Sequence, residues 1–209
     1  AKAWQAAPDV MTNVYFLVDS PANIGALYPW LDVVSLLPPG LQLNRFEWYQ
    51  RGVQSSGASL WCAEPFQDLA VGWAMDVSGP VQRESGQKGV TVINVNMDKL
   101  TDKHLGKTAG NLVLLSKAGV VVGASPSAAR WLGVVGLKAD IVKKTKENKF
   151  ASADFRLGAG GQTALAKALA QALADGKLEG TIEVDRVSRG WLSMDIPEVG
   201  FRLIGFSGS

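Results

Sequence analysis

The chain has 209 residues, of which 47% are hydrophobic and 19% are charged, and its formal net charge is +2. This composition supports a folded core and excludes an intrinsically disordered chain. The weak charge argues against a nucleic-acid partner, which would need a clustered basic face. No apolar run reaches the roughly 18 residues that a membrane-spanning helix needs. Since Cys62 is the only cysteine, an intramolecular disulfide and a cysteine metal cluster are excluded, and we expect a small buried residue.

The chain opens with a predicted strand, a loop and a short helix. Residues 12–20 are rich in β-branched and aromatic side chains, which is typical of a strand. A loop with Pro and Gly follows and carries Tyr28 and Trp30. Residues 43–54 place apolar side chains at helical spacing, so we expect a short helix that frays or is capped at Gly52.

An antiparallel meander should follow that helix. Alternating and β-branched residues predict strands over 58–66, 70–81 and 88–97, and the last two flank a polar hairpin connection. After the third strand, the segment 98–105 predicts a short helix.

The second half of the chain restarts this pattern. Residues 110–125 predict a hairpin with the turn "SKAG", and "SPSAARWLGV" then begins a helix with good N-cap chemistry. The polar segment 139–150 predicts another helix. The strongest helical signal lies over 161–177, where leucines recur every four residues and Gly176 is the expected C-cap. Residues 179–197 and 200–206 predict terminal strands.

Several short motifs, in the same order as these elements, resemble the double-Cache family of extracellular sensor modules. Each motif alone is weak, but together they extend over most of the chain. They are "NVYFLVDS" with "LYPW", "EWYQRG", "LWCAEPFQD", "SGPV" with "GVTVINVNMDKL", "NLVLLSKAGVVVGAS" and "IPEVGFRLIGF". The resemblance implies an α+β fold of two PAS-like Cache modules in tandem, each an antiparallel sheet flanked by helices.

The resemblance also implies the domain organisation. Residues 1–12 would be the end of a truncated N-terminal helix, 13–104 the membrane-distal module and 105–209 the membrane-proximal module. In this family the domain is the periplasmic or extracellular part of a bacterial inner-membrane receptor, with a histidine kinase, chemoreceptor or cyclic-dinucleotide enzyme as its output. A homodimer in the full-length receptor remains open, and the membrane would be reached only through flanking helices.

A ligand pocket in the first module is the site hypothesis. Five of the seven tryptophans and all three tyrosines lie within the first 73 residues of the chain, and concave small-molecule sites favour aromatic walls. The alternative is that these aromatic residues serve mainly as core. The candidate ligand-binding residues are Tyr28, Trp30, Arg45, Trp48, Tyr49, Trp61, Phe66, Asp76 and Asn94.

The polar candidates can each be interpreted in two ways. Arg45 would bind a ligand carboxylate through a bidentate fork, or it is a surface arginine. The resemblance places the usual arginine one residue later, where this chain has Phe46. Asp76 lies mid-strand, where a lone carboxylate is costly without a partner. Asp68 would bind an amine, but a turn residue is the simpler interpretation.

Strand alternation puts Asn94 on the inward face, at the position where the resemblance implies an aspartate in amino-acid-binding members. An amide cannot supply the full charge that an ammonium needs. This departure favours a neutral or anionic ligand such as a small carboxylate.

Three functions follow from these residues. The first is a small-ligand sensor, and the second is a degenerate module that dimerises or binds a partner protein without a ligand. The third, an enzyme, is disfavoured because one His, one Cys and no paired carboxylates form no catalytic constellation. We expect no cofactor, no metal and no nucleic acid.

Overall fold

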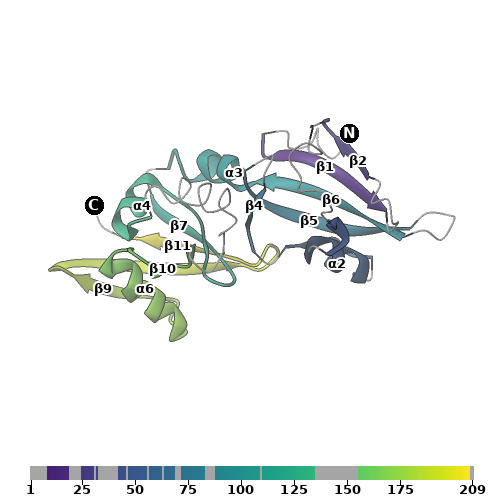
Figure 1. Ribbon diagram of the computed structural model, residues 1–209. Helices are drawn as coiled ribbons and strands as arrows, with labels where there is room; N and C mark the ends of the chain where they lie inside the picture. The colour runs from purple at the N-terminus through teal and green to yellow at the C-terminus, as the bar shows by residue number, and fades with distance from the viewer. Residues whose placement is uncertain are drawn as a thin grey trace. The chain divides into compact units, whose positions relative to one another are not determined.

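The computed structural model describes residues 9–18, 25–30, 32, 42–45, 47–55, 57–62, 64–68, 72–82, 88–108, 110–134 and 155–207. Contacts divide the chain into two compact units. The first consists of Ala1–Cys62 and Asp68–Met97, and the second consists of Ala63–Gln67 and Asp98–Ser209. Each unit is an antiparallel sheet flanked by helices (Figure 1), which confirms the predicted α+β class. The module limits given above stay predictions, and most of the expected N-terminal helix lies outside the described residues.

The first unit is built on a sheet of six strands with the order β2-β1-β6-β5-β3, in which β4 also pairs with β5. A 3-10 helix η2 (Leu43–Arg45) precedes helix α2 (Glu47–Gln54). The strands are β1 (Met11–Val18), β2 (Gly25–Tyr28), β3 (Leu60–Trp61), β4 (Phe66–Asp68), β5 (Gly72–Gln82) and β6 (Lys88–Asn96).

Two local predictions in this unit are wrong. The expected loop around Tyr28 contains the edge strand β2, because Gly25–Tyr28 pairs with the preceding strand β1, and this pairing outweighs local propensity. The single strand expected over 58–66 is two short strands, β3 and β4. Pro65 lies between them, and a proline cannot donate a ladder hydrogen bond.

Helix α2 lies close against the sheet at a glycine. We expected Gly52 to end this helix, but Gly52 is buried inside it and α2 continues to Gln54. A Cβ at Gly52 would lie 2.5 Å from a methyl carbon of Val90 and 3.4 Å from Cβ of Ser78. The glycine therefore allows the helix backbone to approach β5 and β6, which lie just above α2 in Figure 1.

We predict that Gly52→Ala destabilises the protein. Val90 is fully buried and its branched side chain is stiff, so the added methyl group must push α2 away from the sheet. Overpacking of this kind costs about 1–3 kcal/mol, measurable by urea unfolding. Gly161→Ala is the matched control, because a Cβ there meets nothing within 4 Å. Equal stability of the two variants would contradict the close approach.

The second unit is a five-stranded sheet with the order β8-β7-β11-β10-β9. Helices α4 and α6 pack on one face, over a core that includes Leu115, Leu169, Trp191 and Ile204. The helices are α3 (Met97–His104), α4 (Pro126–Leu132) and α6 (Ala164–Ala174), and the strands are β7 (Asn111–Ser116), β8 (Val121–Ala124), β9 (Glu179–Val184), β10 (Val187–Ile196) and β11 (Phe201–Phe206).

Several predictions for this unit are confirmed. The hairpin over 110–125 is β7 and β8, and the strong helical signal is α6, with Gly176 at a φ of 77° just after its C-cap Asp175. Residues 179–197 form a hairpin of two strands, since Asp185 and Arg186 have positive φ angles of 51° and 64° and make a tight turn. The polar helix expected over 139–150 lies outside the described residues.

Candidate functional site

Three polar side chains lie side by side in the first sheet. The register pairs Asn13 of β1 with Asn94 of β6, and Asn94 with Asp76 of β5. Directly paired residues of antiparallel strands share one face of the sheet, so the three side chains form a row across three strands. The exposed fractions are 4% for Asn13, 1% for Asn94 and 0% for Asp76. We call Asn13, Asn94 and Asp76 the polar row.

Four atoms of the polar row are buried without a hydrogen-bond partner. They are Oδ1 of Asn13, Oδ1 of Asp76 and both polar side-chain atoms of Asn94. An unsatisfied buried polar atom costs about 1–3 kcal/mol, and folded proteins contain few of them. Their concentration in one row makes the polar row the candidate site.

Asp76 is electrostatically unusual. Burial, followed by the negative charge of Asp68, raises the pKa of its carboxyl from 3.8 to about 8. The Tyr15 hydroxyl donates a hydrogen bond to Asp76 Oδ2 at 3.4 Å, which acts in the opposite direction. At neutral pH the carboxyl therefore holds its proton when nothing else neutralises it.

The Tyr15 hydroxyl is tuned by the same surroundings. Burial is the largest cause that raises its pKa well above 10.0, and Asp76 is the next. Tyr15 therefore stays protonated and available as a donor to Asp76.

Aromatic side chains cover the face of the sheet that carries the polar row. Tyr15 shares this face with Asn13, and Trp48 of α2 meets Tyr15 edge-on, with ring centroids 5.4 Å apart at 88°. Trp48 and Tyr49 belong to an apolar cluster with Val90 and Val92, the residues that precede Asn94 on the same face of β6. The polar row thus lies at the end of the apolar surface beneath α2.

The structure brings together four of the nine predicted site residues. Asp76 and Asn94 are neighbours in the row, and Asn94 is buried on the inward face as predicted. Trp48 and Tyr49 lie on the same side of the sheet, where they are 7% and 4% exposed, so they pack as core. Whether any of these residues binds a ligand stays a prediction.

The other five predicted residues are not part of this group. Tyr28 pairs with Val14 and Trp61 pairs with Val77, so both belong to the opposite face of the sheet. Trp30 is 76% exposed, Arg45 is exposed on η2, and Phe66 is half-buried in β4.

Sequence reasoning missed Asn13 and Tyr15, and it took Asp68 for a turn residue. Asp68 instead ends strand β4, and its charge acts on both Asp76 and Tyr15. A signal for Asn13 was present, since it is a lone amide in the apolar strand "MTNVYFLV" at the same parity as Tyr15 and Leu17. Only the pairing with β6 reveals that it faces Asn94.

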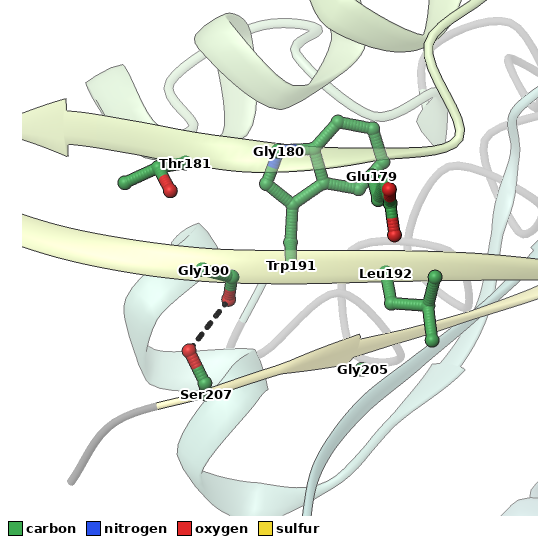
Figure 2. A pocket seen from close by; sticks show the side chains of 8 residues that line it. All are labelled: Glu179, Gly180, Thr181, Gly190, Trp191, Leu192, Gly205 and Ser207. Carbon is green, nitrogen blue, oxygen red and sulfur yellow. Dashed lines mark hydrogen bonds between the residues drawn. The ribbon is translucent and has the colours of Figure 1, made fainter.

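A hollow lies on the sheet of the second unit. Figure 2 shows this groove of about 420 Å³, where Ser207 donates a hydrogen bond to the carbonyl oxygen of Gly190 at 3.3 Å. Its lining is mostly glycine and small or apolar side chains: Glu179, Gly180, Thr181, Gly190, Trp191, Leu192, Gly205 and Ser207. Among the described residues, the buried polar atoms without partners lie outside this lining, so the polar row is the stronger candidate.

Two further findings concern the described part of the chain. It contains no helix long and apolar enough to cross a membrane. Within the same ranges, no group of three or more His, Cys, Asp or Glu side chains is placed to hold a metal ion.

Comparison with known proteins places this fold among sensor domains. No protein-family model and no curated protein sequence matches the chain. The ligand-binding domain of the Pseudomonas fluorescens chemoreceptor CtaA, in complex with L-isoleucine, matches 100% of this chain and 72% of its own, at 15% identity and a TM-score of 0.59. The chain has the fold of the Cache-type sensor domains, as its motifs predict.

Two other solved structures give the same result. The Campylobacter jejuni Tlp3 ligand-binding domain with L-norvaline matches 99% of this chain and 68% of its own, at 12% identity and a TM-score of 0.59. The ligand-binding domain of the Pseudomonas aeruginosa PAO1 amino acid chemoreceptor PctC with GABA matches 97% and 76%, at 16% identity and a TM-score of 0.59. At these identities the likeness is one of fold.

We predict that Asp76 makes the ligand-free protein less stable as the pH rises. Between pH 3.8 and about 8 the folded protein holds a proton that the unfolded chain has released, so the free energy of unfolding falls across this window and levels off above it. Asp76→Asn cannot ionise and should flatten this dependence. Urea unfolding at several pH values between about 5 and 8 measures both slopes.

Asp195→Asn is the control for this experiment. A hydrogen bond from Arg202 at 2.6 Å lowers the pKa of Asp195, so this carboxyl stays ionised throughout the tested range. Its removal should leave the slope unchanged. A wild-type slope no steeper than that of Asp76→Asn would show that Asp76 is ionised in the folded protein.

Proposed function

We propose that this chain is the small-ligand-sensing domain of a bacterial signalling receptor and that the ligand binds at the polar row of the first unit. The observation that carries this proposal is the set of four buried, unpartnered polar atoms on three adjacent strands. Its groups are one carboxyl and two amides. Amides bind and orient but do not exchange protons at neutral pH, so the row suits recognition rather than catalysis.

We further propose that the ligand presents a protonated amine. An ammonium group has three N–H donors, and the row offers three unpartnered acceptor oxygens, one each on Asn13, Asn94 and Asp76. Asp68 adds negative charge nearby. An ammonium group would balance the negative charge of Asp68 and allow the Asp76 carboxyl to ionise. It would also donate hydrogen bonds to the three unpartnered oxygens.

This proposal reverses the preference for a carboxylate ligand that Asn94 suggested. The missing charge at position 94 is supplied by the facing strand, since Asp76 is the direct partner of Asn94. The remaining unpartnered atom, Nδ2 of Asn94, is a donor suited to an oxygen elsewhere on the ligand. The ligands named for CtaA, Tlp3 and PctC are L-isoleucine, L-norvaline and GABA, which all carry an amine.

The receptor context is part of the same proposal. The domain would lie on the periplasmic or extracellular side of the membrane, with flanking helices linking it to a histidine kinase, a chemotaxis module or a cyclic-dinucleotide enzyme. Ligand binding would shift the population of two conformations that such an output distinguishes.

A module without a small ligand is the alternative. This alternative is favoured by the burial of Trp48 and Tyr49, which pack in the core rather than lining an open ligand pocket. The polar row argues against it, because a purely structural sheet would not require three adjacent polar side chains with orphaned atoms.

We predict that a thermal-shift screen of amino acids, amines and organic acids stabilises the protein with an amine. Asp76→Asn should weaken binding of that amine roughly 10- to 100-fold, the cost of losing a charge-assisted hydrogen bond in a buried site. The double variant Asp76→Asn with Asn94→Asp returns the carboxylate to the row on the neighbouring strand and should restore much of the affinity. Calorimetry gives each dissociation constant.

Asp195→Asn again serves as the control, since that exposed carboxylate belongs to the second unit. Stabilisation by organic acids alone would contradict the amine proposal. Full affinity in Asp76→Asn would place the ligand elsewhere, and a folded protein that no ligand stabilises would favour the alternative module.

A further inference from the structure

The only cysteine of the chain lies directly beside the polar row. Strand β3 pairs with β5 so that Trp61 faces Val77. One residue further on, the Cys62 amide donates a hydrogen bond to the carbonyl oxygen of Asp76 at 2.8 Å. This bond continues the antiparallel register and makes Cys62 the direct partner of Asp76. Side chains paired in this way share one face of the sheet, with Cβ atoms about 4.5–5.5 Å apart.

Packing agrees with this placement of Cys62. The residue is 6% exposed, and it belongs to the apolar cluster that contains Trp48, Tyr49 and Val92. This cluster covers the face of the sheet that carries the polar row. The thiol therefore lies between the Asp76 carboxyl and the aromatic side chains of α2.

A buried cysteine is ordinarily a small apolar core residue. The neighbours of Cys62 are what distinguish it. Oδ1 of Asp76 is buried without a hydrogen-bond partner, as are both polar side-chain atoms of Asn94, the next residue of the row. A molecule that supplies partners to these atoms would lie within reach of the Cys62 sulfur, because only one strand spacing separates the thiol from the carboxyl.

We propose that Cys62 is a covalent modification site of the polar row, and that it reacts with small disulfides or thiosulfonates that carry an ammonium group. The ammonium would lie on the row while the reactive sulfur lies at Cys62 Sγ. The Cys62 thiolate attacks that sulfur and forms a new S–S bond. The sulfur's bond to its leaving group breaks, the leaving group takes the electron pair, and the thiol proton passes to solvent.

The row should also make this reaction selective. A reagent that is held by its ammonium reacts as if its concentration near the thiol were raised, whereas a neutral reagent gains nothing from the carboxyl and amide oxygens. The preference for a cation rests on the proposed function. The position of the thiol beside Asp76 rests on the strand register alone.

The test compares two reagents of similar size, 2-aminoethyl methanethiosulfonate and propyl methanethiosulfonate, which differ in a terminal ammonium or methyl group. Each leaves a mixed disulfide on the thiol and releases methanesulfinate. Mass spectrometry of the full chain near neutral pH gives both rates, in the folded protein and in urea, where the ratio reports intrinsic reactivity. Folding should raise the ratio in favour of the aminoethyl reagent about 10-fold, which is the effect of one charge-assisted hydrogen bond.

Two variants test where this preference comes from. Asp76→Asn should remove most of it. Val134→Cys in a Cys62→Ala background should show none, because it places a similarly buried thiol (Val134 is 7% exposed) in the apolar core of the second unit.

A second measurement covers the case that Asp76→Asn fails to fold. Urea unfolding of the two wild-type adducts should find the aminoethyl adduct more stable than the propyl adduct, because its tethered ammonium pairs with the row. The proposal is overturned if folded wild type reacts with neither reagent, or if its rate ratio equals that in urea. It is also overturned if Asp76→Asn keeps the preference, if Val134→Cys shares it, or if the aminoethyl adduct is no more stable than the propyl adduct.

The two proposals can fail separately. A preference that depends on Asp76, in a protein that no untethered amine stabilises, would support the modification site and contradict the proposed function. If a stabilising amine binds the propyl adduct with full affinity, Cys62 does not belong to the site, and the proposed function stands.

Discussion

A carboxyl group buried in the middle of a sheet is the constraint on which this structure depends. Asp76 is fully buried, and the charged form of its carboxyl is disfavoured by burial and by Asp68. The hydrogen bond that this carboxyl accepts from Tyr15 is long, at 3.4 Å. Folded domains are stable by only about 5–15 kcal/mol. Several buried polar atoms without hydrogen bonds therefore cost a large share of the free energy of unfolding. Under the function proposed above, a ligand with complementary donors completes the row.

The elements around Asp76 form a continuous path of contacts. Gly52 lets α2 approach Val90, which places Trp48 against Tyr15, and Tyr15 reaches Asp76. On the other side, Asp68 ends strand β4, which pairs with β5. A ligand that neutralises Asp76 would therefore act on α2 through the aromatic rings.

Much of the fold could be predicted from the sequence, because periodicity and turn chemistry are local signals. The hairpins of β5 with β6 and of β7 with β8, and helices α2, α3, α4 and α6, all follow from such patterns. Strand β2 could not be predicted, because only its pairing with β1 makes Gly25–Tyr28 extended.

Local signals likewise revealed only part of the candidate site. Alternation in β6 was enough to turn Asn94 inward, and a mid-strand carboxylate marked Asp76 as unusual. That these two residues are direct partners, and that Asn13 completes the row, is set by register between distant strands, which no local pattern encodes. The aromatic residues were a weaker guide to the site. Tyr28 and Trp61 lie on one face of the sheet, whereas Trp48 and Tyr49 pack against the other.

The central claim is that an ammonium group replaces the proton of Asp76. Calorimetric titration of a stabilising amine near neutral pH, repeated in buffers of different ionisation enthalpy, counts the protons released on binding. The account predicts release of close to one proton per ligand in the wild type, because the carboxyl is protonated before binding and ionised after it. Binding of the amine with no proton release would contradict it.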